Sequence, residues 1–226
     1  MTIHFIREVD TLKAQISELS GRVEALLDKA VHAVMERDTK EAAAVLDEDH
    51  QIDQAEVDLE EECLKILALH QPVAHDLRFI VAVMKINNDL ERVGDLAVNI
   101  AERAIFLADQ PLPATDFDFP HMADRATAML RDSLDALLKQ DLKLAEKVRA
   151  ADDEVDQLNR DMYEQIKNSI RRDVSQVDAL IHLLSISRHL ERVADHATNI
   201  AEDVIYMLKG QIVRHQHEKY EPNADD

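Results

Sequence analysis

The feature that most constrains this chain is a long motif that occurs twice. Residues 89–102 read DLERVGDLAVNIAE and residues 189–202 read HLERVADHATNIAE, so most positions are identical at a spacing of 100 residues. Weaker similarity precedes each copy, where residues 47–53 match residues 150–156 at a spacing of 103. The simplest account of this pattern is two homologous units, one after the other in the chain.

The composition predicts that both units are built from helices. The 226 residues include only 3 Gly and 5 Pro, whereas 32% of the residues are charged and 4% are aromatic. This balance favours long helices that pack through aliphatic side chains. Because no stretch alternates apolar and polar residues between turn signals, no sheet is expected. The predicted fold class is therefore all-α, with two tandem homologous three-helix bundles.

Apolar periodicity and turn residues predict six long helices. Their expected ranges are 2–37, 40–70, 73–109, 121–140, 142–172 and 175–209. Thr2 is the expected N-cap of the first helix, and Gly210 is the expected C-cap of the last. The predicted organisation is a first unit over 1–110, a proline-rich linker over 111–120, a second unit over 121–212 and a polar tail over 213–226.

Each copy of the motif carries acidic and amide side chains at positions i, i+4, i+8 and i+11. They are Glu91, Asp95, Asn99 and Glu102 in the first copy, and Glu191, Asp195, Asn199 and Glu202 in the second. This spacing keeps the four side chains close to one face of a helix. The preceding helix of each unit adds an acidic pair at i and i+4, namely Asp49 with Asp53 and Asp152 with Asp156.

Hairpin geometry predicts that the two sets of carboxylates meet. Residues at equal distances from the turn of an antiparallel hairpin lie at the same level. In the first unit, the pairs centred on the predicted turn at Pro72 are Asp53 with Glu91 and Asp49 with Asp95. In the second unit, the pairs centred on the predicted turn at 173–174 are Asp156 with Glu191 and Asp152 with Asp195. Four carboxylates are therefore expected at one level in each unit.

Four carboxylates at one level, without facing Lys or Arg, favour a site for a hard cation. Oxygen ligands suit Mg²⁺, Ca²⁺, Mn²⁺ or iron, and the absence of a Cys/His set disfavours structural zinc. The alternative is that the acidic pairs splay apart into solvent and only mark the surface of the helices.

Charge and cysteine content narrow the partners and the compartment. The formal net charge of −20 disfavours binding to nucleic acid or to bare anionic lipid and favours cations and basic protein surfaces. The single cysteine, Cys63, excludes a disulfide within one chain and fits a reducing compartment. No signal peptide is visible, and no apolar run approaches the roughly 20 residues of a membrane span. A cytoplasmic location is expected, with peripheral attachment to a membrane complex left open.

The sequence gives little support for catalysis. None of the eleven histidines lies three residues after a Glu, the spacing that ferritin-like di-iron bundles use. His196 is the only imidazole beside either acidic set, and its counterpart is Leu96. No glycine-rich phosphate loop or nucleophile elbow is present. A non-catalytic adaptor is the favoured interpretation. The alternatives are a metal-dependent enzyme acting on phosphate compounds and a structural helical protein without a ligand.

The chain resembles the PhoU family of phosphate-specific transport accessory proteins over nearly its whole length. The segments that carry the resemblance are HFIREVDTLK (4–13), ALHQPVAHDLRFI (68–80), NNDLERVGDLAVNIAE (87–102) and SRHLERVADHATNIAE (187–202). The resemblance implies two three-helix bundles related by pseudo-twofold symmetry.

It also implies multinuclear metal clusters on paired acidic motifs, with iron, zinc, manganese or magnesium as the candidate cations. In this sequence the implied ligands are Asp49, Asp53, Glu91, Asp95, Asp152, Asp156, Glu191 and Asp195. The implied role is negative regulation of the phosphate-starvation response, by linking the ATPase of a phosphate ABC transporter to a sensor histidine kinase. Homodimers are common among proteins of this kind, so a homodimer is expected.

Overall fold

The described part of the chain folds into six long helices. The computed structural model describes residues 3–111 and 117–213, and these contain no strand. The helices are α1 (Ile3–Glu36), α2 (Thr39–His70), α3 (Ala74–Ala108), α4 (Phe119–Lys139), α5 (Leu142–Arg172) and α6 (Val177–Lys209), with a 3-10 turn, η1 (Val174–Gln176), before α6. The predicted all-α class and six helices are confirmed, and every helix end lies within about two residues of its predicted position.

Aspartate side chains determine where three of the helices begin. Asp38 accepts hydrogen bonds from the backbone N–H groups of Lys40 and Glu41 at the start of α2. Asp118 and Asp141 cap α4 and α5 in the same manner. These side chains satisfy N–H groups that the first turn of a helix leaves without a partner. At the other end of the second unit, Gly210 adopts a positive φ of 71° as the predicted C-cap of α6.

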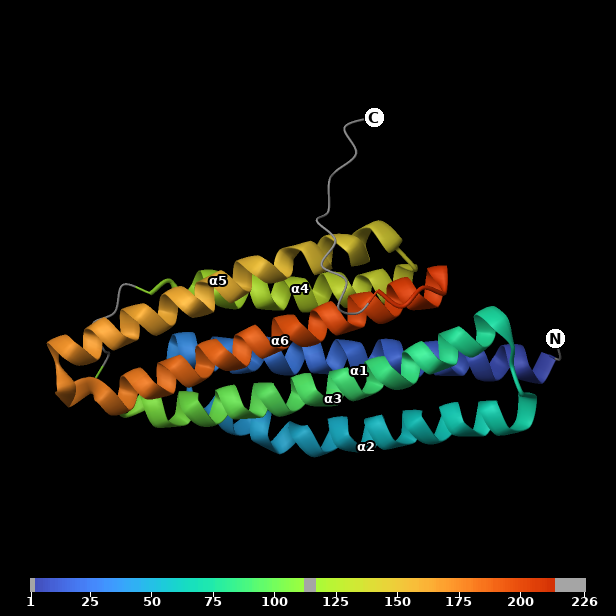
Figure 1. The fold of residues 1–226 in the computed structure, drawn as a ribbon. Coiled ribbons are helices and arrows are strands. Elements are labelled where there is room, and N and C mark those ends of the chain that lie inside the picture. Colours follow the sequence, from blue (N-terminus) through green and yellow to red (C-terminus); the bar gives the residue numbers. More distant parts are fainter. Residues whose placement is uncertain (1–2, 112–116, 214–226) are drawn as a thin grey trace, which may run out of the picture.

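The two units lie side by side and contact each other along their lengths (Figure 1). The central contact is between α3 and α6, which run in opposite directions, and α1 packs against α4 behind them. Equivalent positions are buried in both units. Val23, Leu26 and Leu27 of α1 are fully buried, and so are their counterparts 103 residues later in α4, Ala126, Met129 and Leu130. The shared pattern of burial is what the duplication predicts.

Polar side chains also cross the contact between α3 and α6. Lys85 Nζ lies 3.1 Å from Oδ1 of the buried Asp203, and His182 stacks on Phe106 with ring centroids 3.7 Å apart. Within the first unit, Arg37 connects the end of α1 to the end of α3. It donates hydrogen bonds to the carbonyls of Leu107, Ala108 and Gln110. Arg37 thereby caps the C-terminus of α3, a role that the sequence pattern did not reveal.

A few expectations fail or fall outside the described residues. Leu77, in the first turns of α3, is one of the apolar residues whose periodicity predicts a buried helix face, yet it is 40% exposed. Thr2, most of the predicted tail and the middle of the predicted linker lie outside the described residues. Within those residues, no helix combines the length and the apolar content that crossing a bilayer requires.

Candidate metal centre

The clearest carboxylate cluster lies between α5 and α6. Asp156 from α5 and Glu191 and Asp195 from α6 each offer an oxygen within 4.8 Å of the other two. Asp152, one turn before Asp156, accepts a hydrogen bond from Thr198 Oγ1 at 3.2 Å. Because α5 and α6 form an antiparallel hairpin, residues from both helices are at one level. These residues include Asp156 and Glu191, which the sequence predicts to lie at equal distances from the turn of this hairpin.

Electrostatics confirm that the second-unit carboxylates are close together. Burial, followed by the charges of the neighbouring Glu191, Asp152 and Asp156, raises the pKa of Asp195 to about 6. Burial and then Asp156 raise the pKa of Glu191. Removing a carboxylate from water and placing it beside like charges both disfavour ionisation. A cation bound among these side chains would reverse both effects.

The first unit brings together the equivalent four side chains between α2 and α3. Burial, followed by the charges of Asp53 and Asp95, raises the pKa of Asp49. Burial also raises the pKa of Glu91, to which Asp95 and Asp53 add, whereas Arg92 lowers it. The cross-helix neighbours are thus Asp49 with Asp95 and Glu91 with Asp53, as the hairpin geometry predicted.

Gly94 allows α2 to approach α3 at the level of this cluster. A Cβ at Gly94 would lie 3.4 Å from Ile52 Cγ2 and 3.9 Å from Asp49 Oδ1, so there is little free space beside it. The equivalent positions in the second unit are Ala194 and Val155. The first unit thus combines the smaller residue on α3 (Gly94) with the larger one on α2 (Ile52). The second unit combines the larger residue on α6 (Ala194) with the smaller one on α5 (Val155). The summed size of the two side chains is therefore similar in both hairpins.

Arginine side chains lie closer to the clusters than the sequence analysis expected. Arg92 Nε lies 3.4 Å from Glu91 Oε2, and Arg92 Nη1 lies 3.8 Å from Asp95 Oδ2. In the second unit, Arg160 Nη1 lies 3.4 Å from Asp156 Oδ2. The expectation that no basic side chain reaches the carboxylates is therefore wrong. Both arginines are more than half exposed and sit at the edge of their cluster, where solvent screens their charge.

The remaining members of the two motifs do not join the clusters. Asn99 donates a hydrogen bond to the backbone carbonyl of Asp95, and Asn199 donates one to Asp89 on α3. Glu102 is exposed beside Arg103, whereas Glu202 pairs with Arg149 at 3.4 Å. The face predicted for four side chains thus splits after its first two members. The first two members face the neighbouring helix of the hairpin. Asn99 bonds its own helix backbone, Asn199 belongs to the contact between units, and Glu202 forms an ion pair with α5.

His196 belongs to the contact between the units. Its Nδ1 lies 2.8 Å from Asp89 Oδ1 across α3 and α6. The asymmetry that the sequence shows, His196 against Leu96, is explained by this cross-unit partner. The imidazole that stands next to Asp195 in the chain is accordingly engaged in packing the two units.

The family follows from comparison with known proteins. The family model described as "PhoU domain" matches this chain twice, over residues 16–104 and 119–204. The chain belongs to the PhoU family. A PhoU homologue from Aquifex aeolicus, described as a phosphate-specific transport system accessory protein, is 39% identical over 213 residues, which are 94% of this chain and 96% of that relative. A homologue from Pseudomonas putida with the same description is 36% identical over 93% of this chain and 83% of that relative.

Solved PhoU structures share the fold. The crystal structure of PhoU from Pseudomonas aeruginosa matches with a TM-score of 0.89 and 34% identity, covering 92% of this chain and all of that one. The PhoU structure from Streptococcus pneumoniae matches with a TM-score of 0.82 and 30% identity, covering 92% of this chain and 99% of that one. The two matches of the PhoU domain correspond to the two three-helix units of this chain.

The donor set fits a cation that prefers oxygen ligands. Within the second cluster, three carboxylate oxygens from two helices converge, and no thiol or imidazole joins them among the described residues. In the first cluster, Glu91 Oε2 is buried and accepts no hydrogen bond from the described residues, although Arg92 Nε forms an ion pair with it at 3.4 Å. Convergent carboxylates with raised pKa values and a buried acceptor are what a bound cation would satisfy.

Proposed function

We propose that this protein is a non-catalytic regulatory accessory of a phosphate transport system. Membership of the PhoU family supports this role. The Aquifex aeolicus relative is described as a transport system accessory protein, and the Streptococcus pneumoniae structure as a phosphate transport system regulatory protein. The finer role that we propose is negative regulation of the phosphate-starvation response, through contact with the ATPase of a phosphate ABC transporter and with a sensor histidine kinase.

We further propose that each unit holds a metal cluster on its four carboxylates. The observation that carries this proposal is the convergence of Asp156, Glu191 and Asp195 in the second unit. The equivalent carboxylates of the first unit lie near enough to raise one another's pKa, which supports a similar site there. The proposed ligands are Asp49, Asp53, Glu91 and Asp95 in the first unit and Asp152, Asp156, Glu191 and Asp195 in the second. Bound iron, manganese, magnesium or zinc would neutralise these side chains and fasten α2 to α3 and α5 to α6.

Elemental analysis of protein purified without a chelator or an affinity tag tests the clusters. We expect wild-type protein to carry metal or to take it up from added iron, manganese, magnesium or zinc. Asp53→Ala and Asp156→Ala should each remove the metal of their own unit, and the double variant should carry none. Wild-type protein that neither contains nor takes up metal would exclude the clusters but leave the regulatory role standing.

The regulatory role is tested in the source organism grown with abundant phosphate. Deleting the gene should switch on a reporter of the phosphate-starvation response, and the wild-type gene should silence it again. Co-purification with the transporter ATPase and with the sensor kinase, in separate experiments, tests the two proposed partners. A reporter that stays silent after the deletion would contradict negative regulation, whatever the metal content of the protein.

A further inference from the structure

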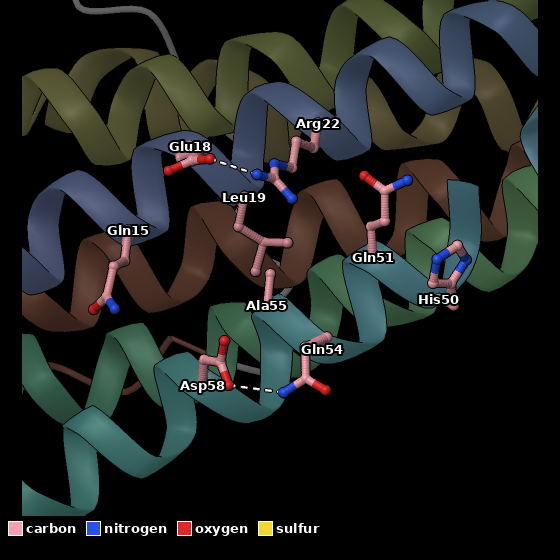
Figure 2. Close-up of a pocket in the computed structure, with 9 residues that line it drawn as sticks. All are labelled: Gln15, Glu18, Leu19, Arg22, His50, Gln51, Gln54, Ala55 and Asp58. Atoms are coloured by element: carbon pink, nitrogen blue, oxygen red, sulfur yellow. Dashed lines mark hydrogen bonds and ion pairs between the residues drawn. The ribbon is translucent and has the colours of Figure 1, made fainter. Parts of the chain in front are cut away.

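A groove between α1 and α2 lies on the side of the first unit formed by these two helices (Figure 2). It has a volume of about 610 Å³. Arg22 and Glu18 line it from α1, and Gln51 and Gln54 line it from α2. Arg22 Nη2 lies 2.6 Å from Glu18 Oε1 on its own helix, so the guanidinium does not bridge to α2.

The equivalent place in the second unit is bridged. Arg125 is the counterpart of Arg22 at a spacing of 103, and its Nη2 lies 2.6 Å from Glu154 Oε2 across α4 and α5. The residue of α2 that corresponds to Glu154 is Gln51. The position of Glu18 is taken by His121 in the second unit, so each arginine pairs with the carboxylate within its reach, Arg22 on its own helix and Arg125 on the next. In the first unit, Arg22 therefore leaves the groove between α1 and α2 without a bridge at this level.

The lining of the groove suits a peptide segment. Gln51 and Gln54 offer carboxamides, which can donate to and accept from peptide groups. The carboxamide oxygen of Gln15, also in the lining, is buried and accepts no hydrogen bond from the described residues. Leu19 and Ala55 lie between the two helices and provide an apolar base. A bound segment could satisfy the Gln15 oxygen with an N–H group and cover the apolar base.

The charge of α2 indicates a basic segment. This helix contains ten acidic residues against two lysines, whereas α5, its counterpart, contains seven acidic and seven basic residues. On the outer face of α2, beyond the groove, Val57 and Leu64 are 45% and 51% exposed. They are seven residues apart, so they share one face of the helix, with the exposed Glu60 and Glu61 between them. Apolar side chains between carboxylates complement a segment that combines apolar and basic residues.

We propose that the groove between α1 and α2, together with the outer face of α2, is the docking site for a basic segment of a partner protein. Lys or Arg side chains of the segment would meet Glu60, Glu61 and Asp58, and its apolar side chains would cover Val57 and Leu64. This inference requires neither the metal clusters nor the phosphate-related role. It assigns a surface and a chemical class of partner to the first unit alone.

The test measures binding of a fluorescein-labelled amphipathic peptide built from Lys and Leu at helical spacing. We expect wild-type protein to bind the peptide and Gln51→Glu to weaken binding about tenfold, because Arg22 would leave Glu18, bridge to the new carboxylate and close the groove. Simple attraction between net charges predicts the opposite, since this variant is more acidic. Gln157→Glu adds the same charge on α5 and should bind as wild type does.

A second variant separates closure of the groove from other effects of the substitution. Arg22→Ala combined with Gln51→Glu removes the bridge while keeping the added carboxylate, so it should restore binding to at least the wild-type level. Circular dichroism of each variant verifies the fold. Failure of wild-type protein to bind, or unchanged or tighter binding by Gln51→Glu, would overturn the proposal. Neither result would bear on metal content or on the starvation reporter, so this failure is distinguishable from failure of the proposed function.

Discussion

The two units have closely similar cores but different surfaces. Many buried positions correspond, as with Leu90 and Leu190, both fully buried on the central helices α3 and α6. Surface positions diverge, as with Gln51 and Glu154 and with Glu18 and His121, and these two differences leave Arg22 with a carboxylate on its own helix and Arg125 with one on the next. Packing of close-fitting side chains tolerates little change after duplication, whereas exposed positions are free to acquire separate roles.

In the acidic clusters, the carboxylates are the same in both units, whereas the neighbouring charges differ. Their carboxylates are kept in both units, although exposed charge is otherwise free to change. Their surroundings differ, since Arg92 contacts two carboxylates of the first cluster through its own helix, whereas Arg160 contacts one carboxylate of the second. Carboxylates that persist where the neighbouring charges diverge are better explained by a shared ligand than by packing.

Truncating the matched core residues should have the largest effect. Leu90→Ala and Leu190→Ala should each lower the free energy of unfolding by about 2–5 kcal/mol, because each removes a fully buried side chain and leaves a cavity. Denaturant titration measures the change. Leu138→Ala, at a position that is 46% exposed, is the control and should change stability by less than about 0.5 kcal/mol. A large cost in one unit and none in the other would contradict the equivalence of the two cores.

A pH-dependent effect is expected at His189, whose counterpart is Asp89. Burial, together with the charges of Arg103, Arg192 and Arg188, lowers the pKa of His189 from the ordinary 6.5 to about 4. The folded state therefore binds fewer protons than the unfolded state between these values. The associated stability is present above pH 6.5 and is lost as the pH falls toward 4, an effect of up to about 3 kcal/mol.

Urea titrations across this pH range test the expectation with His189→Asn. The variant should lose less stability than wild type on acidification, because it has no imidazole to protonate. His50→Asn, at an exposed position of α2, is the control and should keep the wild-type profile. Parallel profiles for wild type and His189→Asn would show that protonation of His189 does not oppose folding.

Neutralising one carboxylate should distinguish the two clusters in metal-free protein. Asp195→Asn should raise stability by less than about 1 kcal/mol, because it relieves repulsion among side chains that are partly screened by solvent. Asp95→Asn should give a smaller gain, because Arg92 already lies 3.8 Å from that carboxylate. Thermal unfolding after removal of metal measures both. Equal gains would mean that Arg92 does not compensate the first cluster.

Much of this comparison could be predicted from the sequence, because helical period and hairpin symmetry depend only on residue number. Equal distance from the turns predicted which carboxylates face each other, for example Asp53 with Glu91. Side-chain choices could not be predicted in this way. Arg22 can reach either Glu18 or a residue of α2, and residue spacing alone does not decide between them; the structure shows that it pairs with Glu18. The spacing of Asp156 and Arg160, four residues apart on one helix, is the sequence signal for the ion pair that they form.

The smallest effect concerns the bridge that the second unit has and the first lacks. Gln51→Glu should raise stability, and Glu154→Gln should lower it, each by about 0.2–1 kcal/mol, because an exposed ion pair gains little over solvation. A double-mutant cycle with Arg22→Ala isolates the new interaction, since the gain from Gln51→Glu should vanish without the guanidinium. Both effects should shrink at high salt. If Gln51→Glu adds stability in the absence of Arg22, the gain does not come from the bridge, and the charge at this position does not determine whether the groove is open.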